Sequence, residues 1–427
     1  MGRGRIVTDL LGARMGRFVT DRGTALMTVM ATTSILFVLA TSLMLMVSYQ
    51  TQSTMIRTAR VRATHVADAG INAYLFQLKA QYGYYTHTPD TGWVGIGDGE
   101  SYRVQATPPN GSTPLTLHST GVAGDGTVTI AATVRYPSFA DYMFLSNEDI
   151  NIGSAALING MVRCNADVIN AGHITGKVTA AGDVANSGTM DQGFTEHQAP
   201  VDFNQVLASM DDIMFSAKGN NAYFPASGAY GYRVTVNGRT VTVGKITGGT
   251  TTGVLQTVAV TSLNVPASGA LYFSDSVWVS GTYSTPLTIV SDHDIYVPNN
   301  YVPSDPNSIV TGGLIAKGNI IVPCWYASVP QAMSLTAAML SQSGRIYADT
   351  KQGVFRNSIV IIGSETYYDA NGGFVVVNSY GQPTAGFLTR TYTYDQRLDD
   401  FPPPKYPVIQ DGSLKVATWI EDRTPTF

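Results

Sequence analysis

The chain has 427 residues, of which 44% are hydrophobic, so it can bury a sizeable core and is not a disordered protein. Only 13% of the residues are charged and the net charge is −4, which argues against a nucleic-acid-binding protein with its usual basic face. The two cysteines are too few to form a zinc site alone, and the six scattered histidines show no ligand spacing.

The first 49 residues predict a basic leader followed by a membrane span. Residues 1–23 hold five arginines against two aspartates, and the 26 residues 24–49 hold no charge. A helix needs roughly 20 residues to cross a hydrocarbon core. Because basic residues keep their side of a span in the cytoplasm, we expect a cytoplasmic leader and a C-terminal region outside the cytoplasm. A cleaved signal peptide, the alternative, would have an apolar region of only about 7–15 residues.

The helix is predicted to continue beyond the span and to pack on strands. One apolar stripe has helical spacing and contains Ala63, Ala67, Ile71, Leu75 and Leu78. The helix should end near Gly83. Alternating segments at residues 100–106, 115–121 and 128–136 predict three strands. Residues 50–140 are therefore expected to form a small α+β unit.

Two motifs in this region resemble those of type IV pilins. Arg22-Gly23-Thr24-Ala25-Leu26, before the apolar run, resembles the site where prepilin peptidase cuts after the glycine. The segment ATHVADAGI at residues 63–71 is similar to the A-x-x-A-E-A-G-I/L element of PilX-type minor pilins. The resemblance covers about residues 20–80. It implies cleavage between Gly23 and Thr24 and a pilin-like helix on an antiparallel sheet. The implied partners are other pilin or minor pilin subunits, the peptidase and the lipid bilayer, with no nucleic acid.

One position departs from the family pattern. Major pilins carry glutamate at the fifth mature residue, where it can neutralise the terminal amine of a neighbouring subunit within the membrane. Counting from Thr24, this chain has Thr28 there. The resemblance therefore implies a minor subunit at a filament tip, in place of a repeating subunit of the shaft.

An internal repeat occupies residues 141–190 and 286–395. The repeated strands begin with an apolar residue just after a turn, at Ile150, Val168, Val184, Ile295, Ile320 and Ile346. These positions are 18 and 16 residues apart in the first block and 25 and 26 apart in the second. Short regular periods indicate stacked units, and strands of this kind predict a parallel β-solenoid with Ile and Val inside. An ordinary β-sandwich with similar strand ends is the alternative.

The remaining segments complete the predicted architecture. Residues 191–285 read as an insertion with a helix that begins near Pro200 and ends at Gly219, followed by a β-hairpin with Asn237-Gly238 at its turn. Residues 396–427 read as a Pro-rich tail that either packs back on the core or hangs free. The fold class predicted for the whole chain is mainly β with a long N-terminal α-helix.

No catalytic, metal or cofactor site is predicted. Asp292-His293-Asp294 offers paired carboxylates, as in enzymes that cleave polysaccharides. The same residues lie in the repeated turn, where aspartate binds backbone amides, so a structural role is favoured. Cys164 and Cys324 occupy different phases of the repeat, which favours two separate buried thiols over a disulfide between the two blocks.

These observations predict a membrane-anchored minor pilin or pilus-assembly protein. It would present a β-rich domain outside the cytoplasm, at the tip of a type IV pilus-like filament. It would reside in the cytoplasmic membrane and enter the pilus on assembly, with no enzymatic activity. A β-solenoid surface adhesin outside any pilus and a membrane-anchored carbohydrate-active β-helix enzyme are the alternatives.

Overall fold

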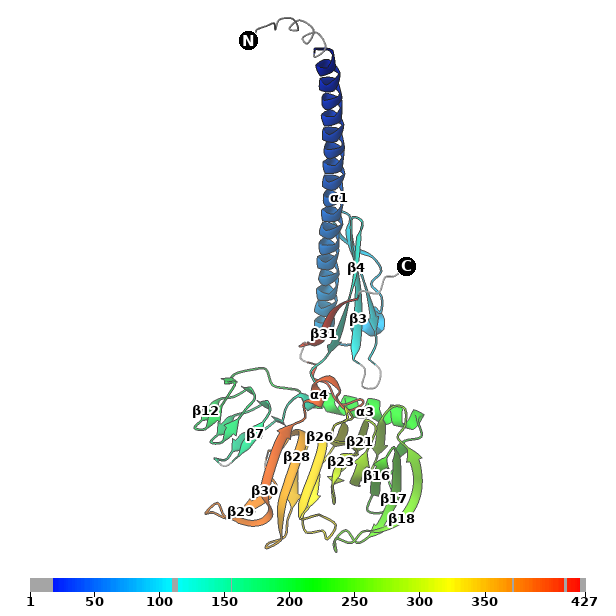
Figure 1. The fold of residues 1–427 in the computed structure, drawn as a ribbon. Coiled ribbons are helices and arrows are strands. Elements are labelled where there is room, and N and C mark those ends of the chain that lie inside the picture. Colours follow the sequence, from blue (N-terminus) through cyan, green and yellow to red (C-terminus); the bar gives the residue numbers. More distant parts are fainter. Residues whose placement is uncertain (1–17, 110–113, 155, 371, 411–412, 423–427) are drawn as a thin grey trace, which may run out of the picture.

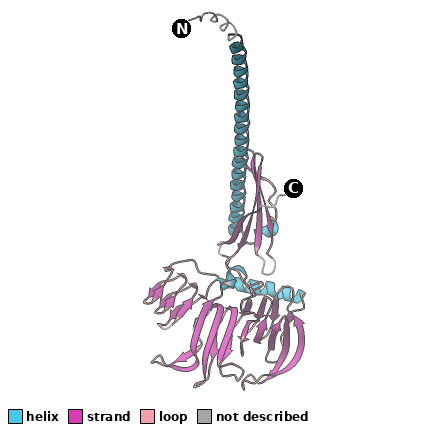
Figure 2. Cartoon of the chain, viewed as in Figure 1, coloured by secondary structure: helices cyan, strands magenta, loops and turns pink. Residues whose placement is uncertain are grey.

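The computed structural model describes residues 18–109, 114–154, 156–370, 372–410 and 413–422. Figure 1 shows a long helix, a small sheet on its lower half and a wide body of stacked strands. Helices other than the long one form a thin layer between the sheet and the body, as Figure 2 shows. The predicted fold class, mainly β with a long N-terminal helix, is confirmed.

The long helix α1 (Phe18–Ala80) ends three residues before Gly83, which has a left-handed backbone and precedes the short helix α2 (Tyr84–His87). Its predicted stripe is buried at Ala63, Ala67, Ile71 and Leu78. Leu75 is only half-buried; Tyr74, one residue earlier, is 2% exposed and takes its place.

The small sheet is antiparallel and has five strands. Their order is β1 (Val94–Gly97), β2 (Glu100–Thr107), β3 (Leu115–Ala123), β4 (Gly126–Arg135) and β31 (Lys415–Asp422). The three predicted strands are confirmed, and β1 and β31 are additional. Because β31 pairs with β4, the C-terminal segment packs back on the sheet and does not hang free.

Three faces of mainly parallel strands make up the large body. The first contains β15 (Tyr223–Phe224), β19 (Ala270–Phe273), β21 (Leu287–Ser291), β24 (Gly312–Ala316), β26 (Ala332–Ser341), β28 (Phe355–Tyr367), β5 (Phe144–Ser146), β8 (Val162–Cys164), β11 (Val178–Ala180) and β14 (Phe194–Thr195). The second contains β16 (Tyr232–Gly238), β20 (Val277–Tyr283), β23 (Tyr301–Pro303), β26, β28, β30 (Pro383–Tyr394), β7 (Leu157–Asn159), β10 (His173–Ile174) and β13 (Thr189–Met190). Long strands bend at a corner and so belong to two faces.

The third face is made of two separate groups of strands. The first group is β20, β22 (Ile295–Tyr296), β25 (Ile320–Pro323) and β27 (Ile346–Asp349). The second group is β6 (Ile150–Ile152), β9 (Val168–Asn170) and β12 (Val184–Asn186), which form a sheet of their own. Among the described residues, no strand bridges β27 and β6, so this face is interrupted.

The stacking order of the body differs from the order of the chain. β28 pairs with β5, so the later repeat block stacks on the start of the earlier one. The chain therefore enters the body in the middle, winds to one end, crosses to the other end along α3 (Asn204–Gly219) and winds back (Figure 1). Both predicted blocks belong to one continuous stack.

The predicted insertion needs correction for this reason. Its helix is confirmed as α3, and its hairpin as β16 and β17 (Thr240–Gly248), to which β18 (Gln256–Asn264) is added. However, β16 pairs in parallel with β20, and β19 and β20 are themselves stacked strands. Residues 191–285 thus begin the stack at its far end and do not separate two blocks.

The repeat register agrees with the sequence alignment. Ile150, Val168 and Val184 are in register on the third face, as are Ile295, Ile320 and Ile346 in the other group. The turn before each strand is joined to the next coil through a side chain. The amide of Asp167 donates to Asp149 Oδ1 at 3.1 Å, and the amide of Asn319 donates to Asp294 Oδ1 at 2.7 Å. The structural interpretation of Asp294 is therefore confirmed.

Both cysteines are buried and neither is in a disulfide. Cys164 is on the first face, whereas Cys324 follows β25 on the third face. The thiol of Cys164 donates to the carbonyl of Glu148 at 3.1 Å and accepts from the amide of Ala166 at 3.3 Å. Ser291 makes bonds of the same kind in its own coil, so Cys164 occupies a position that suits a small hydroxyl side chain.

We expect Cys164→Ser to change the free energy of unfolding by less than about 1 kcal/mol, because a hydroxyl can make both bonds. Cys164→Val should cost about 1–3 kcal/mol, because it leaves the buried amide of Ala166 without an acceptor. Urea unfolding of both variants measures the difference. Equal stability of the two variants would contradict this assignment.

Candidate functional site

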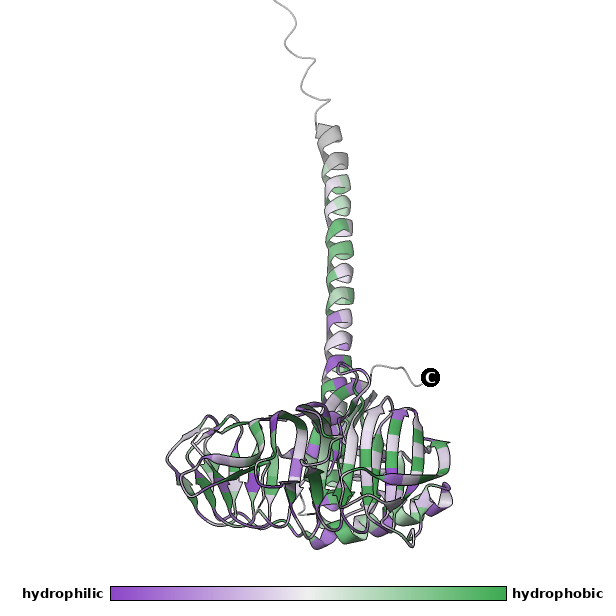
Figure 3. Cartoon of the chain, turned by 90° about the horizontal axis from the view of Figure 1, so that it is seen from below, coloured by the Kyte–Doolittle hydropathy of each residue, from purple (hydrophilic) through white to green (hydrophobic). Residues whose placement is uncertain are grey.

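The upper half of α1 has no packing partner within the chain. Its side chains from Ala25 to Arg57 are exposed, including Leu26 at 64% and Phe37 at 71%. Figure 3 shows how apolar this free half is. By length and composition it is able to cross a membrane. A stretch of this size, left bare in water, would be a large apolar patch, and a bilayer is the natural solvent for it.

The polar side chains of this half are satisfied within the helix itself. Hydroxyls of Thr28, Thr32 and Ser34 donate to carbonyls three or four residues earlier, at 2.8–2.9 Å. Backbone bonding of this kind lowers the cost of a hydroxyl in hydrocarbon. At the fifth mature position, Thr28 therefore offers a neutral group bonded to Ala25.

The predicted cleavage bond between Gly23 and Thr24 lies within the backbone of α1. Leader residues 1–17 lie outside the described part of the chain.

The lower half of α1 packs closely on the sheet through small residues. A Cβ atom added to Gly121 would lie 2.3 Å from the carbonyl oxygen of Ala63 and 2.4 Å from the amide nitrogen of Ala67. A Cβ added to Gly126 would likewise be 2.5 Å from the backbone of Ala59. Any side chain at these two glycines would push the helix off the sheet.

The element at residues 63–71 has a clear structural role. Asp68 accepts a hydrogen bond from the indole of Trp419 on β31, at 3.1 Å. A Cβ on Gly70 would meet Ser119 at 2.4 Å, and Ile71 is fully buried. Arg60, just before this element, pairs with Glu421. The motif that resembles a minor pilin thus attaches both the central sheet and the C-terminal strand to the helix.

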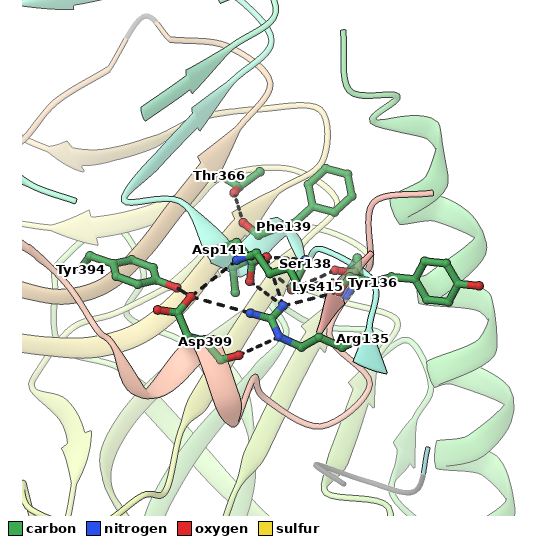
Figure 4. A network of polar contacts seen from close by, with 11 residues as sticks. Arg135, Tyr136, Ser138, Phe139, Asp141, Thr366, Tyr394, Asp399 and Lys415 are labelled. Carbon is green, nitrogen blue, oxygen red and sulfur yellow. Dashed lines mark hydrogen bonds and ion pairs between the residues drawn. The ribbon is translucent and has the colours of Figure 1, made fainter. Parts of the chain in front are cut away.

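Two segments connect the sheet to the body, and a network of charges holds them together (Figure 4). Arg135 ends β4 and is directly opposite Lys415 on β31. Two like charges in this position repel one another. Asp141 compensates both, with its carboxylate oxygens 2.8 Å from Arg135 Nη1 and 2.8 Å from Lys415 Nζ. Asp141 is only 1% exposed.

The network also includes the segment that follows β30. Asp399, on α4 (Arg397–Asp400), accepts from Arg135 Nε through its backbone carbonyl at 2.6 Å. Its carboxylate accepts from the hydroxyl of Tyr394 at 3.1 Å. Asp141 further accepts from the amide of Ser138, closing the cap of the short helix η1 (Phe139–Asp141). Both crossings between sheet and body are thereby joined.

The sequence predicted part of this arrangement. It located the apolar helix, its packed stripe and the 63–71 element. It missed the Arg135–Asp141–Lys415 network, whose members come from three distant segments and share no local motif. The proximity of Arg135 and Asp141, six residues apart around a proline, is a weak local signal of such a pair.

Comparisons with known proteins give few similarities. No family model and no curated protein matches the chain. The crystal structure of the competence-associated pilin ComZ from Thermus thermophilus is similar at a TM-score of 0.34 and 11% identity, covering 85% of this chain and 98% of that one. An ice binding protein from an Antarctic Biological Consortium gives a TM-score of 0.17 and 12% identity, covering 51% and 90% respectively. At these TM-scores neither similarity defines the function of this chain.

Proposed function

We propose that this chain is a membrane-anchored minor pilin or pilus-assembly protein with a structural role. It would hold its parallel β body outside the cytoplasm, at the tip of a type IV pilus-like filament. The observation that best supports the proposal is the division of α1 into a free apolar half and a half packed on a sheet. Such a helix can exchange lipid for the helices of other pilin subunits while its attached domain stays folded.

The neutral Thr28 supports a rare position in the filament. Its hydroxyl is bonded to the carbonyl of Ala25, 2.9 Å away, and carries no charge that could pair with the terminal amine of a neighbour. A charge at this depth is costly unless it is paired. A subunit without one has less to gain from the interior of a shaft, where each helix is surrounded by others.

Processing by prepilin peptidase tests the proposal. In a host that has the peptidase, mass spectrometry should find a mature chain that begins at Thr24. Gly23→Leu should block this cleavage, whereas the matched control Gly12→Leu, within the leader, should not. Only chains that retain Met1 would remove the pilin mechanism and favour a surface adhesin. Sheared filaments should contain the processed chain in small amounts relative to the shaft subunit.

Orientation is tested in the same host. Alkaline phosphatase fused after Phe427 should be active, because the C-terminal region is expected outside the cytoplasm. The carbohydrate-active alternative makes a different prediction, namely hydrolysis of a glycan by the purified full chain.

A further inference from the structure

A buried glutamate lies where the two repeat blocks meet. Glu365, on β28, is in register with Met339 on one side and with Phe144 on the other. Its amide donates to the carbonyl of Met143 at 2.8 Å, which fixes this register. The neighbouring Thr366 points outward, toward the carbonyl of Phe139. Because side chains alternate along a strand, Glu365 points into the body.

Every other described coil has an apolar side chain at this inner position. The equivalent residues, in stacking order, are Leu271, Ile289, Leu314, Met339, Phe144, Val162 and Val178. Glu365 is 3% exposed, and its Oε1 has no hydrogen-bond partner. Native proteins rarely leave a buried polar atom unsatisfied, so this oxygen requires an explanation.

The interruption of the third face provides one. A cavity of about 580 Å³ lies between Ile346 of β27 and Ile150 of β6, and Glu365 is part of its wall. Tyr392 and Phe374 also line it. Residues 368–373 stack on β27, where the amides of Tyr368 and Asp369 donate to the carbonyl of Gly344, but they form no sheet with β6. Volumes of about 300–1,000 Å³ are typical of ligand pockets.

The charges around the cavity favour a cation. Asp149 and Asp369 are at its rim, and Arg390 is its basic lining residue. Arg390 Nη1 donates to the carbonyls of Phe387 and Leu388, at 2.8 and 3.2 Å, so it is already engaged with the backbone. Among the described residues, no group of three or more acidic, histidine or cysteine side chains could hold a metal ion.

We propose that this cavity binds an organic ammonium group, which Glu365 receives through its unpaired oxygen. An ammonium group offers three donors and a full positive charge. In a site shielded from water, its attraction to a carboxylate is much stronger than at the surface. The proposal does not depend on the pilin function and would hold for an adhesin as well.

Binding of a cation here must be linked to release of a proton. Burial raises the pKa of the Glu365 carboxyl to about 8, so the empty site is mainly protonated at neutral pH. An ammonium ligand selects the ionised form, so affinity should rise about tenfold per pH unit between pH 6 and 8. The other titratable or charged groups near Glu365 are Tyr367, Tyr392, Cys164, Asp149, Asp369 and Arg390. Burial raises the pKa of both tyrosines and of the thiol, so these stay neutral in this range.

Two matched pairs of probes test the proposal on the full chain in lipid nanodiscs. They are 1,5-diaminopentane against 1,5-pentanediol, and D-glucosamine against D-glucose. By calorimetry, at least one ammonium probe should bind, and its neutral partner should bind at least tenfold more weakly. Titration in two buffers of different ionisation enthalpy should show release of about one proton per site at pH 7. A preference for the diamine indicates a lysine-like ligand, and a preference for glucosamine an amino sugar.

Variants assign the effect to Glu365. Glu365→Gln keeps the shape of the neutral acid, and should weaken ammonium binding at least tenfold and abolish proton release. Glu100→Gln, on the distant small sheet, should leave both unchanged. Equal binding of the charged and neutral probes, no binding of either ammonium probe, or unchanged binding by Glu365→Gln would each overturn the proposal. If Glu365→Gln does not fold, the probe pairs and proton release in the wild-type chain still decide it.

Discussion

Replacing Asp141 with alanine should lower the free energy of unfolding by about 3–5 kcal/mol, the usual cost of breaking a buried ion pair from one side. The substitution would leave Arg135, which is 10% exposed, and Lys415 facing each other with their shared counter-charge removed. It would also leave the amide of Ser138 without its acceptor. Thermal unfolding of the full chain measures the loss.

Asp399→Ala is the matched control for this experiment. Its carboxylate is 45% exposed and is 3.7 Å from Arg135 Nη2, so its loss should cost less than about 1 kcal/mol. Protease cleavage near residues 136–143 should increase in Asp141→Ala and remain at the wild-type level in Asp399→Ala. Similar stability of the two variants would show that the network does not hold the junction.

Glu365 should make the stability of the body depend on pH. Burial raises the pKa of its carboxyl from 4.5 to about 8. Between these values the native state retains a proton that the unfolded chain has released, so stability falls as the pH rises. The expected slope for this one group is about 1.4 kcal/mol per pH unit. Below pH 4.5 both states are protonated and the contribution is constant.

Comparison of Glu365→Gln with the wild type isolates this slope, because all other titrating groups are common to both. Chemical unfolding between pH 5 and pH 8 should show a growing advantage of the variant, with its largest value at pH 8. Glu100→Gln should follow the wild type throughout. A constant difference between Glu365→Gln and the wild type across this range would refute the assignment.

Features set by neighbouring residues could be predicted from the sequence. The apolar run and the stripe of α1, the Asn237-Gly238 hairpin and the register of Ile150 with Val168 all depend on short spacings along the chain. The strand pairing of β28 with β5 could not, because Glu365 and Phe144 are 221 residues apart and nothing local indicates which block stacks first. β31 was missed for the same reason, since its partner β4 is about 280 residues away.

The inward position of Glu365 did leave a trace in the sequence. Ile359 and Ile361 are buried on the inner side of β28, and Glu365 continues their alternation by steps of two. The spacing alone thus places a carboxyl among core residues. What the sequence could not show is the open third face, because it results from the way that the two blocks meet.

The central entry of the chain into the body has a consequence for how the molecule can change its length. Both segments that connect to the small sheet leave from the middle of the stack, and neither outermost coil carries a chain end. Gaining or losing a coil at either extremity therefore leaves the anchor untouched. The two wings can vary in span independently, as a balance beam can be extended on either side of a fixed pivot.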